Sequence, residues 1–501
     1  MREFERFNTV CVNAYVRPRM ENYLARLEQE LKARGTKGPL YMIHSGGGLI
    51  SVETAKAFPV RLVESGPAGG AIYAASYAAR FGLNKVLSYD MGGTTAKICL
   101  IDNAVPETAR TFEVARTTRF KKGSGMPISI PVIEMVEIGA GGGSLASVDA
   151  MGRIQVGPES AGSDPGPACY QRGGEEPAIT DADLLLGKID ADSFAGGNIQ
   201  LSLQAAQSAV QSRVGEIQGL STDAAAFGIC EMVDENMANA ARIHAVESGK
   251  DITGTTMIAF GGAAPLHAAR LCEKLGVSRC LIPPGAGIGS AIGFLRAPFA
   301  YEAVRTVLMH LSEFDAAAAN EILQGLRASA TGFVAPNAAG AAIYQETIVY
   351  MRYQGQGWEI PVELPDQVFA DADATLFLEN FRAAYTRFFG RAIDGLDGVE
   401  VEIVTWSARA AAHQPPQDRV PLSTGNQDAT PETQRQVFDP TTGEFITSAI
   451  HSRTNLVSRD RISGPAIIIE DETSTILTSA FDAVMQDDGS ILIHRKDGDL
   501  T

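Results

Sequence analysis

A short segment of this sequence combines residue types that bind phosphate. Positions 88–95 read Ser-Tyr-Asp-Met-Gly-Gly-Thr-Thr, and the apolar run Ile98 to Ile101 follows. The pattern predicts a strand, a glycine turn and a second strand. The adjacent Gly92 and Gly93 allow the backbone to turn with its N–H groups pointing outward, which forms a concave cradle for phosphate oxygens.

Three further residues of this hairpin carry oxygen atoms that suit the same chemistry. Thr94 and Thr95 add hydroxyl donors to the cradle, and Asp90 stands at the end of the first strand. A carboxylate there could hold a magnesium-bound water or position an attacking group, since Mg²⁺ contacts proteins through one or two carboxylates. Taken alone, the segment is equally compatible with a plain tight hairpin turn.

A second glycine-rich junction stands between a strand and a helix. The apolar run Met257 to Phe260 predicts the strand and Leu266 to Leu275 predicts the helix, with Gly-Gly-Ala-Ala-Pro between them. Glycines after a strand allow close backbone approach, and the helix N-terminus favours an anionic or polar ligand. The junction is therefore a candidate ligand loop.

The candidate ligand contacts in this junction are Gly261, Gly262 and Ala263. His267 follows at the start of the helix, either as a neighbour of the binding site or as a histidine with satisfied partners. For that residue alone the second interpretation is favoured. Two more glycine-dense loops, Gly139 to Ser144 and Val156 to Tyr170, either form a site or pack tightly.

Composition restricts the class of protein. With 59 acidic residues against 42 Lys and Arg, the net charge of −17 would repel a nucleic-acid backbone, although a local site could still bind a nucleotide. The most apolar stretch, Leu281 to Leu295, is broken by prolines and glycines and is too short for a membrane span. Six cysteines without a Cys-x-x-Cys pair or a zinc spacing favour a reducing cytoplasmic location, with Cys169 either a reactive thiol or, more commonly, a buried inert one.

The composition and periodicity of the sequence change along the chain. An amphipathic helix is predicted over Met20 to Arg34, and hairpins are predicted over 144–156 and 347–364. A change near residue 300 and a Pro- and Gln-rich stretch over 412–431 predict boundaries. The expected division is therefore an α/β core over 1–300, a mixed α/β segment over 301–411, and a linker with a small β-rich domain over 412–501.

These motifs resemble those of the hydantoinase A/oxoprolinase family. Asp-Met-Gly-Gly-Thr-Thr is similar to the family's second phosphate loop, and Phe260 to Ala268 is similar to the loop that lies against adenosine. Glu64 to Gly70 resembles a junction lining the nucleotide cleft, and the similarity reaches from Arg2 to Ile468. The resemblance implies an actin-like (ribonuclease H-like) ATPase core with ATP and Mg²⁺ as cofactors, and Asp90 as catalytic residue and metal ligand.

The resemblance also implies the activity and its partners. Family members use ATP to phosphorylate a carbonyl-derived oxygen of a lactam, imide or ketone, and a large hydantoinase B-type subunit completes hydrolysis or carboxylation of the small-molecule substrate. Full-length members begin with another lobe that carries a first phosphate loop, so we expect that lobe to be a separate chain or to be truncated here, and this chain to be inactive alone.

Two departures from the family pattern keep alternatives open. Lys97 stands where many members have Asp, and Ala264 replaces a glycine, which would strain the loop if positive φ were needed there. Lys97 either neutralises phosphate charge or is a solvated strand lysine. The alternatives are an actin-fold kinase or chaperone-like ATPase, and a non-catalytic subunit of a carboxylase or hydantoinase complex.

Overall fold

The computed structural model has a mixed α/β fold and describes most of the chain, namely residues 3–116, 123–338, 340–391, 398–413 and 418–497. The chain forms two compact units. The first joins residues 1–65 to 297–416, and the second joins 66–296 to 417–501. No helix within the described ranges is both long and apolar enough to cross a membrane.

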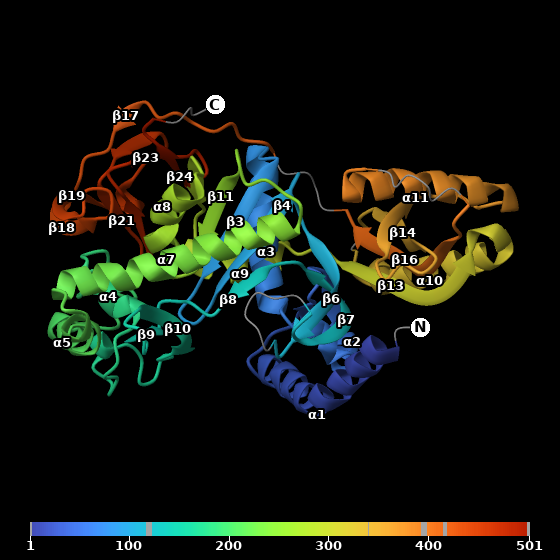
Figure 1. Ribbon diagram of the computed structural model, residues 1–501, viewed down its shortest axis with the longest axis horizontal. Helices are drawn as coiled ribbons and strands as arrows, with labels where there is room; N and C mark the ends of the chain where they lie inside the picture. The colour runs from blue at the N-terminus through green and yellow to red at the C-terminus, as the bar shows by residue number, and fades with distance from the viewer. Residues whose placement is uncertain (1–2, 117–122, 339, 392–397, 414–417, 498–501) are drawn as a thin grey trace. The chain divides into compact units, whose positions relative to one another are not determined.

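A ten-stranded sheet forms the centre of the second unit (Figure 1). Its parallel middle consists of β12 (Arg279–Ile282), β11 (Thr256–Phe260) and β3 (Lys85–Met91), and β4 (Ala96–Asp102) runs antiparallel beside β3. Strand β11 is buried along its whole length, as its apolar residues allow. The carboxyl ends of β12, β11 and β3 meet at one edge, the place where ligands bind in sheets of this kind.

The other elements of this unit surround that middle. The sheet is completed by β5 (Val105–Pro106), β8 (Val136–Ile138), β17 (Gln427–Asp428), β20 (Asp460–Ser463), β23 (Phe481–Met485) and β24 (Ile491–Arg495). Two hairpins stand outside it, β6 (Thr108–Val114) with β7 (Met126–Ile133) and β9 (Ser144–Val148) with β10 (Ile154–Ser160). The helices are α3 (Ser65–Phe81), α4 (Ile179–Leu185), α5 (Leu203–Val210), α6 (Glu216–Gln218), α7 (Thr222–Glu247), α8 (Ala264–Leu275) and α9 (Gly289–Arg296).

Side chains of β3 show which helices cover which face, because neighbouring residues of a strand point to opposite faces. The Tyr89 hydroxyl donates to Met237 Sδ of α7 at 2.9 Å. The carboxylate of the next residue, Asp90, lies against Gly70 of α3. Helix α7 therefore covers one face of the sheet, together with α8, and α3 covers the other.

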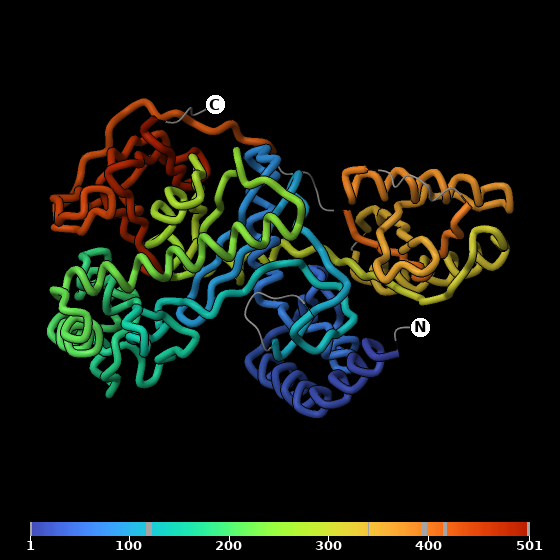
Figure 2. Tube along the Cα trace, viewed as in Figure 1, coloured from blue at the N-terminus to red at the C-terminus, as the bar shows by residue number. Residues whose placement is uncertain are grey.

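The C-terminal segment joins this sheet, which differs from the expected separate domain over 412–501. Strand β24 pairs antiparallel with β12, with Ile493 opposite Cys280, and Ile491, Leu492 and Ile493 are all buried. The tube in Figure 2 follows this last stretch of chain to its place beside the core. The physical reason is that β12 would otherwise present an unpaired edge, which β24 covers.

A smaller four-stranded sheet completes the second unit. It contains β18 (Thr433–Asp439), β19 (Glu444–Ser452), β21 (Ala466–Ile469) and β22 (Ser474–Leu477). Its strand β22 packs on α8. The C-terminal residues therefore share the core of residues 66–296.

The first unit is built on an antiparallel four-stranded sheet in the order β13, β16, β14, β15. Its elements are α1 (Glu3–Ala33), β1 (Tyr41–Ile43), β2 (Leu49–Ser51), α2 (Val52–Ala57), β13 (Ala300–His310), α10 (Ala316–Val334), β14 (Ile343–Tyr353), β15 (Ile360–Leu364), α11 (Ala374–Phe389) and β16 (Val401–Ala412). Trp406, Phe377 and Phe381 are fully buried in its core. Because residues 1–65 join residues after 297, the expected block 1–300 does not form one unit.

Several predicted elements are present with shifted ends. The helix predicted from Met20 belongs to α1, which begins at Glu3 and ends before Gly35 at φ +89°. The two predicted hairpins occur as β9 with β10 and β14 with β15. Strand β16 was not predicted, because its alanines favour a helix; its central position between β13 and β14 overrides that preference.

Candidate functional site

The predicted hairpin is present at the carboxyl end of β3. Gly92 N donates to Thr95 O at 3.2 Å and closes the turn into β4. Gly93 and Thr94 are exposed at its tip, and Gly92 and Thr95 are half-buried. A Cβ added at Gly92 or Gly93 would meet no described heavy atom within 4 Å, and neither residue has left-handed φ. The fold itself therefore does not require glycine at these two positions.

Asp90 lies just beneath this turn on the α3 face of the sheet. Its Oδ2 accepts a hydrogen bond from Ser290 Oγ of α9 at 3.0 Å. A Cβ at Gly70 would stand 3.1 Å from Oδ2, and one at Gly261 would stand 2.7 Å from Oδ1. Burial raises the pKa of Asp90, while the Ser290 hydrogen bond and the Lys97 charge act in the opposite direction. Glycine at positions 70 and 261 therefore leaves room for the Asp90 carboxylate, which a side chain at either position would crowd.

Lys97 lies opposite Asp90 in the register of β3 and β4. Its Nζ donates to Thr95 Oγ1 at 3.0 Å and forms an ion pair with Glu137 Oε1 at 3.0 Å. The lysine side chain is 18% exposed. It is thus tied to the hairpin by two contacts, an arrangement different from a solvated strand lysine.

The glycine loop over 139–144 packs against the hairpin and donates hydrogen bonds to its backbone. Gly142 N donates to Gly92 O at 3.0 Å, and Gly143 N donates to Gly93 O at 2.6 Å. A Cβ on Gly141 would come within 2.6 Å of Thr94 N. The sequence left open whether this loop forms a site or packs tightly. In the structure it packs tightly, beside the candidate site.

The loop that follows β11 lies at the same level as the hairpin, because Phe260 is the register partner of Asp90. Ala263 N donates to Met91 O at 2.9 Å, and Thr473 Oγ1 donates to Gly262 O at 2.9 Å. The strain considered for Ala264 does not occur, because this residue is the first of α8 and has no positive φ.

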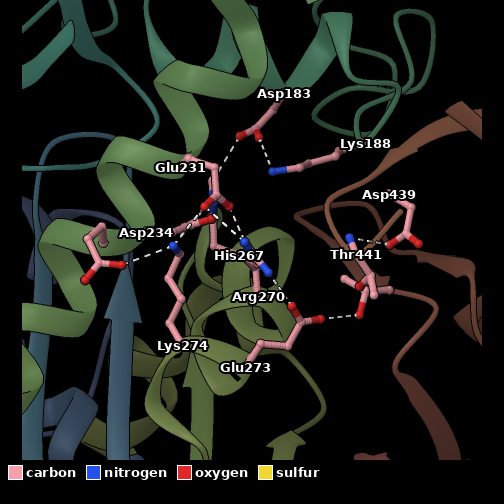
Figure 3. Close-up of polar contacts among 12 residues, drawn as sticks. Asp183, Lys188, Glu231, Asp234, His267, Arg270, Glu273, Lys274, Asp439 and Thr441 are labelled. Atoms are coloured by element: carbon pink, nitrogen blue, oxygen red, sulfur yellow. Dashed lines mark hydrogen bonds and ion pairs between the residues drawn. The ribbon is translucent and has the colours of Figure 1, made fainter. Parts of the chain in front are cut away.

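His267 is fully buried, with both ring nitrogens engaged (Figure 3). Nδ1 is 2.9 Å from Asp234 Oδ1, and Nε2 is 3.1 Å from Asp183 Oδ2. Burial alone would lower the pKa of His267, but the charges of Asp183 and Asp234 raise it to about 9. The imidazole has no free nitrogen for a nucleotide, so the structure favours the satisfied-histidine interpretation.

Cys169, in the second glycine-dense loop, is buried. Asp181 Oδ1 accepts from Cys169 N at 2.7 Å, and Oδ2 accepts from Ala178 N at 2.7 Å and from Ala168 N at 3.2 Å. Burial and the neighbouring Asp181 raise the pKa of the thiol. The environment matches the inert cysteine, and the carboxylate serves to fix the loop backbone.

Sequence reasoning found the hairpin and the glycine junctions but missed four polar residues around them. These are Ser290, Asp183, Asp234 and Thr473. A signal existed only for Ser290, since the glycines at 285, 289 and 293 mark a helix packed closely on its neighbours. No group of three or more His, Cys, Asp or Glu side chains suited to a metal occurs in the described part of the chain.

The site therefore combines an exposed glycine turn with a buried carboxylate at the carboxyl edge of a parallel sheet. Helix α8 begins directly after the Gly261 loop, and Ser290 is the second residue of α9, so two helix N-termini adjoin the site. Together these features define a mixed α/β protein with a candidate site for an anionic ligand.

Comparison with known proteins identifies the family. The hydantoinase/oxoprolinase model matches residues 6–303, and the model of the hydantoinase/oxoprolinase C-terminal domain matches residues 315–497. The chain belongs to the hydantoinase/oxoprolinase family, which confirms the resemblance seen in its motifs.

Individual relatives cover nearly the whole chain. The caprolactamase subunit alpha of Pseudomonas jessenii is 31% identical over 484 residues, covering 95% of this chain and 68% of that protein. The acetone carboxylase beta subunit of Xanthobacter autotrophicus is 26% identical over 514 residues, covering 99% and 69%. The crystal structure of the ATP-dependent caprolactamase from Pseudomonas jessenii matches with a TM-score of 0.81 at 29% identity, over 99% of this chain and 71% of that chain.

Proposed function

We propose that the second unit is the ATP-binding part of a hydantoinase/oxoprolinase-type enzyme subunit with an actin-like core. It activates the carbonyl of a cyclic amide, an imide or a ketone by phosphorylation, for hydrolysis or carboxylation. Support comes from the site geometry and from the names of the relatives, an ATP-dependent caprolactamase and an acetone carboxylase. The two names refer to a lactam and a ketone, compounds that each contain a carbonyl group.

The observation that carries the proposal is the open space at Gly92 and Gly93. Gly261 and Gly141 are required by close contacts, whereas a Cβ at Gly92 or Gly93 would meet no atom of the described chain within 4 Å. The fold could accommodate alanine at this exposed turn. Glycine there instead leaves space for a bound ligand. Thr94 and Thr95, which carry hydroxyl groups, follow in the same turn, and a glycine turn with backbone N–H groups suits the terminal phosphates of ATP.

Asp90 fits Mg²⁺ in this arrangement. Mg²⁺ is usually held by one or two carboxylates, water and substrate phosphates, and Asp90 is the carboxylate at the base of the hairpin. A cation beside it would offset the desolvation that raises its pKa. Bound there, Mg²⁺ would neutralise phosphate charge, and Ser290 would hold the carboxylate in place.

The proposed partners follow from the relatives, which are named as subunits. We assign substrate binding and the final hydrolysis or carboxylation to a large hydantoinase B-type subunit. A cytoplasmic location agrees with six free thiols, five of them buried. An actin-fold kinase or chaperone-like ATPase would use the same hairpin, but its ATP hydrolysis would not depend on a cyclic amide or ketone.

Substitution of Gly93 by alanine tests the phosphate site. Because the added methyl group meets open space, we expect Gly93→Ala to fold with unchanged or slightly higher stability, by up to about 1 kcal/mol. The same methyl group should weaken ATP binding to the full chain by about tenfold or more, measured by calorimetry with Mg²⁺.

Gly325→Ala in α10 is the matched control, since this glycine also has open space around its Cβ position. It should leave ATP affinity unchanged. Failure of the unaltered chain to bind ATP, or equal affinity of the Gly93→Ala and unaltered chains, would contradict the proposal.

A further inference from the structure

A buried ion cluster joins the three helices α4, α7 and α8 (Figure 3). His267 of α8 contacts Asp183 of α4 and Asp234 of α7, and Asp183 Oδ1 is also 2.8 Å from Lys188 Nζ. Cys230 Sγ donates to Asp183 Oδ1 at 3.3 Å. Two carboxylates and two cations balance in charge, although all four side chains are buried.

Such a cluster is an unusual way to fill a helix interface. Transfer of charges from water into a protein interior costs several kcal/mol per ion in general, and apolar residues of similar volume often replace buried ion pairs without loss of stability. Packing of α4, α7 and α8 therefore does not by itself account for these residues. Their directional contacts can instead fix the relative position of the helices.

Two of these three helices, α8 and α4, are joined to loops of the candidate site. Helix α8 continues directly from the loop Gly261–Ala263. Helix α4 contains Thr180, whose N and Oγ1 donate to Gly142 O at 2.8 and 2.7 Å. Gly142 in turn donates to Gly92 O of the hairpin. The His267–Asp183 contact thus connects the loop on one side of the hairpin to the loop on its other side.

A second set of ion pairs holds α8 to α7 independently. Arg270 Nε is 2.7 Å from Glu231 Oε1, and Lys274 Nζ is 2.8 Å from Glu231 Oε2. These contacts lie one and two turns beyond His267 and involve no residue of α4. Loss of the His267 contacts should therefore loosen the N-terminal end of α8 and its link to α4 without detaching the helix.

We propose that His267 is a positioning residue of the nucleotide site: through Asp183 and Asp234 it holds the loops Gly139–Ser144 and Gly261–Ala263 in place on either side of the phosphate hairpin. The role for ATP rests on the proposed function, whereas the mechanical link can be measured without any nucleotide.

Hydrogen exchange of the free full chain tests the link directly. The amides of Gly142, Gly143 and Ala263 donate the hydrogen bonds that hold the loops to β3 and the hairpin. In His267→Gln, exchange in the peptides covering both loops should accelerate by about tenfold or more. Arg270→Gln, on the same helix, is the control and should leave both loops unchanged.

Thr180→Val provides a milder second variant. It removes the hydroxyl hydrogen bond to Gly142 O but leaves the ion cluster intact. Exchange should accelerate in the Gly139–Ser144 loop and the hairpin but not in the Gly261–Ala263 loop. Unchanged exchange of the loops in His267→Gln, or equal acceleration in Arg270→Gln, would overturn the proposal. If His267→Gln does not fold, Asp234→Asn, which keeps the size of a His267 partner and removes its charge, is judged by the same criterion.

Calorimetry with ATP and Mg²⁺ at varied pH gives the functional readout. In the unaltered chain ATP affinity should decline as the pH rises through about 9, where His267 loses its proton. Among the groups that face it beside Asp234, Asp183 and Lys188 stay charged, because the pKa of Asp183 is lowered and the pKa of Lys188 is raised, and Tyr89 and Cys230 stay neutral, because burial raises the pKa of both. His267→Gln should bind about tenfold more weakly at pH 7 and lack this decline. Absence of binding by the unaltered chain would contradict the proposed function alone; normal affinity in His267→Gln would contradict the positioning role.

Discussion

Glycine serves two purposes around the hairpin, and the surrounding atoms distinguish them. Gly70, Gly141 and Gly261 are required because the chain approaches too closely for a side chain. Gly92 and Gly93 have open space instead. The sequence shows five similar glycines, and only the neighbouring atoms, which come from distant parts of the chain, separate those that permit packing from those that leave room for a ligand.

Substitution of Gly70 by alanine should therefore destabilise the protein, in contrast to Gly93→Ala. The added Cβ would stand 2.8 Å from the Phe260 ring, 2.9 Å from Ser290 Oγ and 3.1 Å from Asp90 Oδ2. We expect a loss of about 1–3 kcal/mol in the free energy of unfolding, measured by urea titration. An unchanged midpoint would show that α3 does not pack against β3 as described.

At the scale of elements, local patterns predicted the hairpins and the helix after Gly261, because turn residues and apolar periodicity lie close together in the sequence. The ion cluster could not be predicted in this way. His267 meets Asp183 and Asp234 across 84 and 33 positions of sequence, and Ser290 meets Asp90 across 200. Strand β16 was missed because the alanines of its second half favour a helix, whereas the position of the whole strand between β13 and β14 keeps it extended.

Stability should depend on pH through this cluster. The pKa of His267 is raised from an ordinary 6.5 to about 9, so its contribution to stability is fully present below pH 6.5 and is lost as the pH rises through about 9. The thermal midpoint of the unaltered chain should fall over that range, and His267→Gln should show a smaller decrease. Parallel decreases in both proteins, measured by calorimetry, would exclude the buried imidazolium as the cause.

In the whole molecule, each compact unit is built from two segments that are not continuous in sequence. The boundaries near 300 and after 412 lie close to the junctions at 297 and 417, where composition changes. The sequence did not predict which segments pack together. Residues 1–65 join 297–416, and the C-terminal strand β24 pairs with β12. Pairings between distant segments leave no local signal in one sequence.

Truncation after residue 416 should consequently disrupt the second unit. It would remove β20, β23 and β24 from the large sheet and expose the edge of β12. We expect an aggregating product whose residues 66–296 are cleaved rapidly in limited proteolysis. Recovery of a protease-resistant core over 66–296 would instead support a separate C-terminal domain.

Phosphorylation of a substrate carbonyl by ATP can be tested by isotope transfer in the native complex. The complex is purified, and a cyclic amide or ketone that stimulates its ATP hydrolysis, with or without bicarbonate, is labelled with heavy oxygen at the carbonyl. For a cyclic amide, that oxygen attacks the terminal phosphorus, water adds to the activated carbon, and the labelled oxygen leaves with the phosphate, so mass spectrometry should find the label in inorganic phosphate. For a ketone, carboxylation returns the labelled oxygen to the carbonyl, so mass spectrometry should instead find a labelled enol phosphate when bicarbonate is withheld. Label retained wholly in the product of the cyclic amide, no enol phosphate from the ketone, or no stimulation by either compound would contradict carbonyl phosphorylation.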